Sequence, residues 1–297
     1  MVSAFCTVMA VSAVTAQAEV TVETATGKAV VAGVPEKVAV FDIAVADTLQ
    51  ALGVEMAGVP SKLYVSYLAE LAGKVPPVGT IFEPDYEALA VMGPDLVIVG
   101  PRTSDKVDAL SQIAPVINMS IMGGDVEAAL RARIAAYGKI FAVEAKADAL
   151  LAKLDSKIAE ARDAVKGKGK GLVILANGNK ISAFGPGSRF GWIHTVVGLP
   201  LATESLEVSV HGHAISFEFI AEVDPDWLLV VDRGAAIGQE GAAQATLDNA
   251  IIARTKAAKA GQIVYLDPAP IYVAGGGATS MLNTLDELIA AFGKTGG

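Results

Sequence analysis

The chain has 297 residues, of which 53% are hydrophobic and 19% charged, and it carries a net charge of −9 at pH 7. This length allows two domains with sizeable cores, and the low charge content excludes disorder as the main state. The acidic balance and the lack of Lys/Arg-rich runs argue against a nucleic-acid partner, but a locally positive cleft could still bind an anion.

The first 18 residues have the composition of a secretory signal peptide. They carry no charge, are mostly apolar and end in Ala16-Gln17-Ala18, which is an A-x-A cleavage pattern. The basic residues that usually begin a signal are missing, so a buried N-terminal helix is the alternative. Cleavage would remove Cys6, the only cysteine, and would place the mature chain in the periplasm. No later apolar run reaches the ~18 residues that a membrane span needs.

Apolar strands alternate with helical segments along the mature chain, which is typical of α/β folds with parallel sheets. The unbroken apolar run at 95–100 favours a central strand that is covered on both faces. In the first half we expect strands at 38–42, 55–60, 95–100 and 116–120, and helices at 46–53, from about Pro84, and at 104–114, capped by Ser104. In the second half we expect strands at 172–178, 180–185 and 262–267, and helices from Ser188, at 243–259 and at 279–293.

The middle of the chain, 125–166, has helical periodicity and no proline, and Gly138 is expected to divide it. The second piece, from about Val143 to Lys166, would span roughly 35 Å and ends at a GKGKG stop. We therefore predict an N-terminal α/β lobe at 19–142, a linking helix at 143–168 and a C-terminal α/β lobe at 169–297. The fold class is α/β, with two Rossmann-like lobes joined by one long helix.

One phrase occurs twice, as EALAVMGPDLVIVGPR and EFIAEVDPDWLLVVDR. Each copy ends in an arginine, Arg102 or Arg233, just past a buried strand. Ligands of open α/β sheets bind beyond the carboxyl ends of the strands, and a guanidinium suits carboxylate, phosphate or phenolate oxygens. The alternative is a surface ion pair with Asp105 or Asp232. Duplication favours ligand binding by both arginines.

Each copy of the phrase begins with an acid, Glu87 or Glu218, at the start of a predicted helix. A negative charge there could simply favour the helix dipole. Because one acid occurs in each lobe, we expect the pair to dock onto basic residues of a partner with two-fold symmetry.

Four further polar residues are candidates for ligand contacts. Arg189 lies in FGPGSRFG, where a helix beginning at Ser188 would offer an anion site, unless the segment is an ordinary turn. His211, His213 and Tyr272 lie in polar loops, and imidazole and phenolate are suitable ligands for ferric iron. Alternatively, the last three side chains only line a loop.

Other motifs narrow the function. His194, Trp192 and Trp227 are predicted to be core residues. We find no HExxH motif, cysteine cluster, G-x-S-x-G motif or Walker A motif, so neither a protein-only metal site nor an enzyme is expected.

Together these features resemble the periplasmic substrate-binding proteins of ABC importers for iron-siderophores, haem and cobalamin. Within that family the chain is most similar to the ferric-catecholate binders of the enterobactin/petrobactin type. The resemblance covers about residues 35–295 and rests on these segments: GSRFG, VHGHAISFEFI, VVDR, LDNAIIARTKAAKAGQIVYLD and IYVAGGG. It implies two α/β lobes with one long bridging helix.

The resemblance also implies roles for individual residues. Arg102, Arg189 and Arg233 match three arginines that face the catecholate oxygens. His211 and Tyr272 match two iron ligands that complete ferric coordination when a siderophore offers only four donor atoms, although His213 could compete with His211. The acids of the repeated phrase match those that dock on the membrane subunits.

The family implies a monomer without an intrinsic cofactor or enzymatic activity, whose ligand is the Fe(III)-siderophore. The partner is then an ABC permease with its ATPase. The alternatives are a haem or cobalamin receptor, a receptor for a bare metal ion, and an α/β enzyme that acts in the cleft between the lobes. The positions of Lys62, Tyr64 and Phe82 fix neither ligand size nor denticity.

Overall fold

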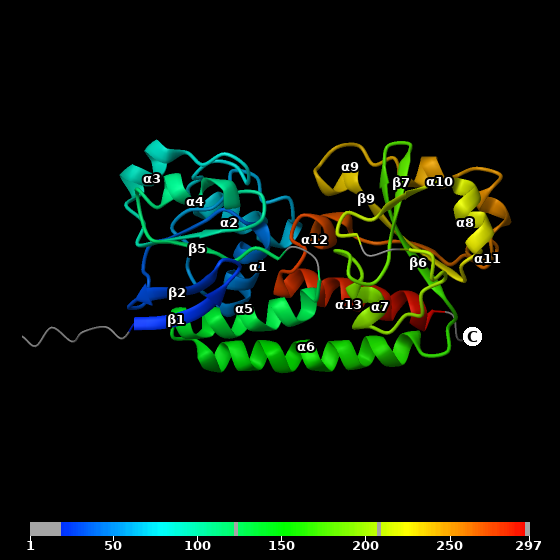
Figure 1. Ribbon diagram of the computed structural model, residues 1–297, viewed down its shortest axis with the longest axis horizontal. Coiled ribbons are helices and arrows are strands. Elements are labelled where there is room, and N and C mark those ends of the chain that lie inside the picture. Colours follow the sequence, from blue (N-terminus) through cyan, green and yellow to red (C-terminus); the bar gives the residue numbers. More distant parts are fainter. Residues whose placement is uncertain (1–18, 122–123, 207–208, 295–297) are drawn as a thin grey trace, which may run out of the picture.

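The computed structural model describes residues 19–121, 124–206 and 209–294, so the predicted signal peptide lies outside the described residues. Two α/β lobes stand side by side on a single 22-residue helix, α6 (Glu144–Val165), which runs beneath both of them (Figure 1). The predicted fold class, with two lobes joined by one long helix, is confirmed.

The N-terminal lobe is built on a parallel three-stranded sheet in the order β3-β4-β5. An antiparallel hairpin, β1-β2, precedes it and was not predicted from the sequence. The expected strand at 55–60 forms only two isolated bridges, one between Gly58 and Ala39 and one between Val59 and Pro77. The elements are β1 (Glu19–Thr24), β2 (Gly27–Ala32), β3 (Val38–Val40), α1 (Ile43–Leu52), η1 (Ser66–Leu68), α2 (Ala69–Lys74), α3 (Tyr86–Met92), β4 (Leu96–Val99), η2 (Ser104–Lys106), α4 (Val107–Leu110), β5 (Val116–Asn118) and α5 (Val126–Ile140).

The C-terminal lobe has a mixed five-stranded sheet in the order β10-β9-β6-β7-β8. Strands β10, β9 and β6 are parallel, whereas β7 runs antiparallel to both of its neighbours, β6 and β8, so the expectation of a parallel sheet is wrong here. The cause is a tight turn at Gly178, whose φ of 60° favours a hairpin. The elements are β6 (Gly171–Asn177), β7 (Lys180–Phe184), α7 (Trp192–Thr195), β8 (His213–Ile215), α8 (Phe217–Val223), β9 (Trp227–Asp232), α9 (Arg233–Ala236), α10 (Ala243–Leu247), η3 (Ile252–Arg254), α11 (Lys256–Lys259), β10 (Ile263–Tyr265), α12 (Pro268–Tyr272) and α13 (Ala278–Gly293).

Three predicted helices are shorter than expected because local side chains bond the backbone into turns. The segment 104–114 holds only η2 and α4, and Ser104 donates to Pro101 O instead of capping a helix. The segment 243–259 is broken where the Asn249 carboxamide oxygen accepts from Ile251 N and Ile252 N. Helix α7 begins only at Trp192, and the Ser188 hydroxyl donates to Gly185 O.

The repeated phrase forms the same unit in both lobes: a short helix, a left-handed turn, a Pro-Asp pair and a central strand. The Asp95 carboxylate accepts from Lys37 N at 3.0 Å, just before β3. In the other lobe the Asp226 carboxylate accepts from Lys170 N at 2.8 Å, just before β6. The repeated aspartate therefore anchors each central strand to its neighbour, and places the following arginine at the carboxyl edge of the sheet.

Helices α5 and α6 form an antiparallel pair. The chain breaks between them at Ala142, which has a φ of 52°, and the expectation that Gly138 divides the helices is wrong. Gly138 lies inside α5, where a Cβ atom would be 2.8 Å from Ala147 Cβ on α6. The glycine therefore allows the two helices to pack closely.

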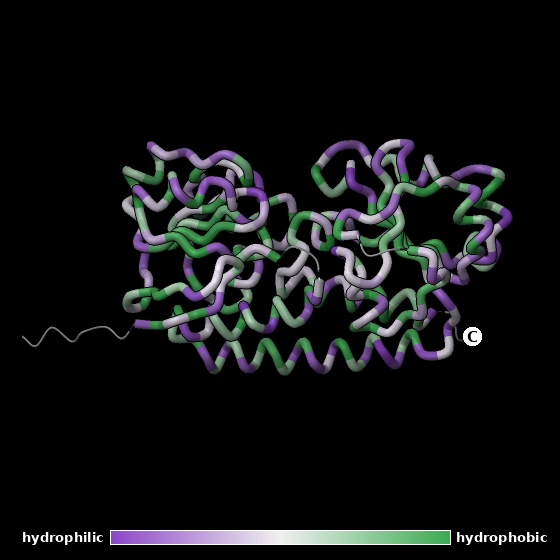
Figure 2. The backbone as a smooth tube through the Cα atoms, in the orientation of Figure 1, coloured by the Kyte–Doolittle hydropathy of each residue, from purple (hydrophilic) through white to green (hydrophobic). Residues whose placement is uncertain are grey.

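One continuous hydrophobic core joins the lobes through α5, α6 and α13. Figure 2 shows apolar segments in the strands of both lobes, and alternating apolar and polar residues along α6. The predicted core residues Trp192, His194 and Trp227 are all buried, and the Trp227 ring lies 4.0 Å from the Phe292 ring of α13. No helix in the described part of the chain is both long enough and apolar enough to span a membrane.

The N-terminus of α13 is capped by the other lobe. Gly277, at the cap position, has no side chain, so Asp47 on α1 accepts from Thr279 N at 2.7 Å and from Ser280 N at 2.9 Å. The fully buried Asp47 carboxylate also accepts from the Tyr67 hydroxyl at 2.5 Å. A Cβ atom on Gly277 would be 2.6 Å from Asp47 Cγ. This contact ties α13 to the N-terminal lobe.

We predict that Asp47→Ala lowers the free energy of unfolding by about 2–4 kcal/mol at neutral pH, because three buried donors lose their acceptor. Thermal and urea unfolding would measure the loss. Asp148→Ala is the matched control, because Asp148 is exposed on α6. Equal stabilities of the two variants would contradict the prediction.

Comparing the unfolding free energies of wild type and Asp47→Ala at two pH values tests how the protonation of Asp47 affects stability. Burial raises the pKa of Asp47 to about 6, above its ordinary value of 3.8, so the folded state holds this proton more tightly than the unfolded state. The stability from this proton is present below pH ~4 and is lost as the pH rises through ~6. The difference between wild type and Asp47→Ala should therefore be larger at about pH 4.5 than at about pH 7.5.

Candidate functional site

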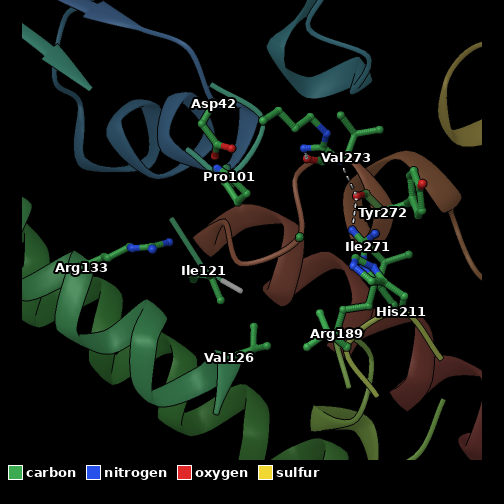
Figure 3. Close-up of a pocket in the computed structure, with 14 residues that line it drawn as sticks. Asp42, Pro101, Ile121, Val126, Arg133, Arg189, His211, Ile271, Tyr272 and Val273 are labelled. Atoms are coloured by element: carbon green, nitrogen blue, oxygen red, sulfur yellow. Dashed lines mark hydrogen bonds between the residues drawn. The ribbon is translucent and has the colours of Figure 1, made fainter. Parts of the chain in front are cut away.

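A cavity of about 340 Å³ opens between the two lobes and is lined by residues from both. Figure 3 shows its walls, which come from the N-terminal lobe, from α5 and from the segment around α12. Four of the side chains predicted from the sequence line this cavity: Arg102, Arg189, His211 and Tyr272. The structure thus brings together residues that lie as far as 170 positions apart in the chain.

The three predicted arginines converge on Tyr272, the last residue of α12. Arg189 donates to Tyr272 O at 2.7 Å, and its guanidinium lies 4.4 Å from the centre of the Tyr272 ring. Arg102 reaches Tyr272 O and Val273 O, each at 3.5 Å. Arg233 Nε donates to the Tyr272 hydroxyl oxygen at 3.1 Å. Tyr272 is therefore in contact with all three cations.

The acids closest in sequence to these arginines bond elsewhere. Asp105 pairs with Lys106, and Asp232 accepts from Ala235 N and Ala243 N to cap α9. The alternative interpretation of Arg102 and Arg233 as members of surface ion pairs is therefore wrong. Within the described residues, none of the three converging arginines forms an ion pair with a carboxylate.

The positive charge of the cavity is partly buried, and Asp42 is the only acid among the lining residues. Burial lowers the pKa of Arg189, and the like charge of Arg102 acts in the same direction. The partners of these guanidinium groups are neutral carbonyl and phenol oxygens. A guanidinium nevertheless stays protonated in proteins. An anion that enters the cavity would meet several charged donors at once.

His211 and Tyr272 face the same space from two different segments (Figure 3). His211 precedes Gly212, whose φ of 75° turns the chain into strand β8. His213 lies in that strand and is not among the cavity-lining residues. Within the described residues, no three His, Cys, Asp or Glu side chains gather in a cluster that could hold a metal ion. The pair offers one nitrogen and one oxygen, which could add to a metal ion already held by a chelator.

Two cavity residues, Asp42 and Arg133, were missed from the sequence. Asp42 caps α1 by accepting from Val45 N at 3.1 Å, and its position at the end of a strand could have signalled it. Arg133 lies within α5, in a helical pattern that gives no such signal. Lys62 is not among the cavity-lining residues and donates to Ile237 O of the other lobe at 2.9 Å.

Glu87 and Glu218 occupy the first turns of α3 and α8, and both are exposed. The two helices lie in different lobes, on the side of the molecule away from α6 (Figure 1). Their carboxylates are thus outside the cavity and available to a partner.

Known proteins are similar to this chain in sequence and in fold. The family model described as periplasmic binding protein matches residues 38–270. The petrobactin-binding protein YclQ of Bacillus subtilis is 38% identical over 258 residues, which is 86% of this chain and 81% of YclQ. The ferric-anguibactin-binding protein FatB of Vibrio anguillarum is 29% identical over 276 residues, which is 90% of this chain and 85% of FatB.

Solved structures of known proteins have a similar fold. The crystal structure of YclQ superposes with a TM-score of 0.86 at 36% identity, covering 93% of this chain and 99% of that one. The periplasmic catecholate-siderophore binding protein VctP of Vibrio cholerae gives a TM-score of 0.82 at 29% identity, covering 94% and 100%. The chain belongs to the periplasmic binding protein family.

Proposed function

We propose that this protein is the substrate-binding component of an ABC importer and captures a ferric siderophore of the catecholate type. The convergence of Arg102, Arg189 and Arg233 on Tyr272, without a carboxylate partner, carries the proposal. The similarity to YclQ, FatB and VctP, all of which bind siderophores, supports it. The ligand is the ferric chelate, and the protein supplies no cofactor of its own.

The chemistry of the ligand fits the charge of the cavity. A ferric tris-catecholate carries about three negative charges, and charge-assisted hydrogen bonds to guanidinium groups offset the cost of removing it from water. A chelator with only four donor atoms leaves two octahedral positions on iron open, which an imidazole and a phenolate can fill. Arg233 Nε donates to the Tyr272 oxygen, so negative charge on that oxygen is stabilised when it binds a metal.

The remaining predictions concern the cellular context. We propose a monomer in the periplasm, exported through a signal peptide at residues 1–18, that catalyses no reaction. The proposed units are the N-terminal lobe (19–142), the linking helix (143–168) and the C-terminal lobe (169–297). The proposed partner is an ABC permease with its ATPase, which the protein meets through Glu87 and Glu218.

A fluorescence-quenching titration of residues 19–297 tests the function. Ferric bis- and tris-catecholates are compared with haemin, cobalamin and free metal ions. We expect saturable quenching with a submicromolar midpoint by ferric catecholates alone. Quenching by haemin or cobalamin instead would support the alternative receptors. Binding of a bare metal ion that is reversed by EDTA would overturn the proposal.

We predict that Arg189→Ala and Arg233→Ala each weaken ferric-catecholate binding by about 1–3 kcal/mol, because each removes a charge-assisted contact. The same titration measures the loss. Arg254→Ala is the control, since Arg254 is exposed on η3, outside the cavity. Unchanged affinity in both the Arg189 and the Arg233 variant would rule out an anion-binding role for these arginines.

We predict that His211→Ala and Tyr272→Phe weaken the binding of tetradentate ferric chelates much more than that of hexadentate ones. Only the tetradentate complexes leave open positions on iron that the protein must fill. His213→Ala is the control for the histidine. Equal losses for both ligand classes would show that neither side chain coordinates iron.

We predict that Glu87→Ala and Glu218→Ala abolish iron uptake by the assembled importer while leaving the dissociation constant of the ferric chelate unchanged. Both carboxylates lie outside the cavity, so a loss of docking should not affect the ligand. Glu222→Ala, an exposed change on the same helix α8, is the control. Normal uptake by the double variant Glu87→Ala/Glu218→Ala would contradict a docking role.

A further inference from the structure

The cavity extends beyond Tyr272 to a second cationic end. Arg133 reaches into it from α5, on the side opposite Tyr272 and His211 (Figure 3). Ile121 and Val126 line the space between these ends and give it an apolar wall. The three converging arginines contact Tyr272 but not this far end, so a group that lies there would need Arg133 as its partner.

Arg133 has no partner of its own. In the described part of the chain it forms neither a hydrogen bond nor an ion pair, and burial lowers its pKa. The nearest acid in the cavity, Asp42, interacts with it electrostatically, but the Asp42 carboxylate is engaged in capping α1 through Val45 N. A partly buried guanidinium thus faces the cavity with its donors unused.

A second polar group without a partner lies behind Arg133. Tyr137 follows one helical turn later on α5, and its hydroxyl is buried without a hydrogen-bond partner among the described residues. Burial raises the pKa of Tyr137, so this hydroxyl remains a donor at neutral pH. Tyr137 is not among the cavity-lining residues, so Arg133 is the group at this end whose free donors a ligand in the cavity can reach.

We propose that Arg133 forms a second anion subsite, which binds a carboxylate carried on the linker of the ferric chelate. The proposal rests on the proposed function and adds a preference within it. The planar fork of the guanidinium matches the two oxygens of a carboxylate. Because the iron and its catecholate oxygens are held at the Tyr272 end, the group at Arg133 belongs to the part of the ligand that joins the metal-binding arms.

The test uses two ferric complexes of the same tetradentate bis-catecholate. In one ligand the linker bears a free carboxylate, and in the other this group is the primary amide, so denticity and size are matched. Dissociation constants are measured by fluorescence quenching with wild type, Arg133→Gln, Arg133→Lys and Arg131→Gln. Arg131 is a matched control on α5, because it pairs with Glu127 and Asp155 outside the cavity.

Wild type should bind the carboxylate complex about tenfold or more tightly than the amide complex, in line with a charge-assisted hydrogen bond. Arg133→Gln should reduce this ratio to below about threefold, and Arg133→Lys, which keeps the charge but not the fork, should give an intermediate ratio. Arg131→Gln should keep the wild-type ratio, because a general effect of net charge on binding would change both arginine variants alike.

Two outcomes would overturn the subsite: equal binding of both complexes by wild type, or a full preference retained in Arg133→Gln. The first of these needs no variant, so it stands even if a substitution in α5 impairs folding. Failure of wild type to bind either complex would instead contradict the proposed function itself. The two failures are therefore distinguishable in one experiment.

Discussion

The arrangement of the site depends on partly buried arginines that form no ion pair with a carboxylate among the described residues. Arg102, Arg189 and Arg233 all contact Tyr272, and their partners are carbonyl oxygens, a phenol oxygen and an aromatic ring. Such partners hold guanidinium groups in place without neutralising them. A ligand with several negative oxygens therefore gains charge-assisted contacts that the protein itself does not satisfy.

The acids near these arginines, in the sequence or in the cavity, have structural roles of their own. Asp42 and Asp232 cap helices α1 and α9, and Asp105 pairs with Lys106. Asp42 lines the cavity and interacts electrostatically with Arg102, but it forms no ion pair with the three arginines among the described residues. The same carboxylates that begin the helices thus leave the cationic cavity open to a ligand.

Arginines from both lobes can contact Tyr272 only if the lobes keep their relative position. Helix α6 spans both lobes, and Asp47 of one lobe caps α13, whose chain continues from the segment that holds Tyr272. Lys157 of α6 also pairs with Asp286 of α13 at 2.9 Å. These contacts favour small movements of the lobes over a wide hinge closure, so the arginines are largely positioned before a ligand arrives.

The sequence predicted the parts of the structure that depend on local pattern. The duplicated phrase located Arg102 and Arg233, and helical periodicity gave α6 to within a few residues of its ends. The contact of all three arginines with Tyr272 could not be predicted. Two of these arginines bind its backbone carbonyl, which carries no sequence signal. Arg133 was missed for a similar reason: its role depends on which face of α5 meets the cavity. The mixed sheet, in turn, depends on a single tight turn at Gly178.

The central claim is that arginines without an ion-pair partner select the ligand by its negative charge, and a charge series tests it most directly. Affinities would be measured for hexadentate ferric complexes of similar size, from a tris-catecholate with about three negative charges to a neutral tris-hydroxamate. We expect affinity to rise with negative charge, and the differences to narrow as salt screens the interaction. Equal affinity for the neutral and the anionic complexes would contradict this account.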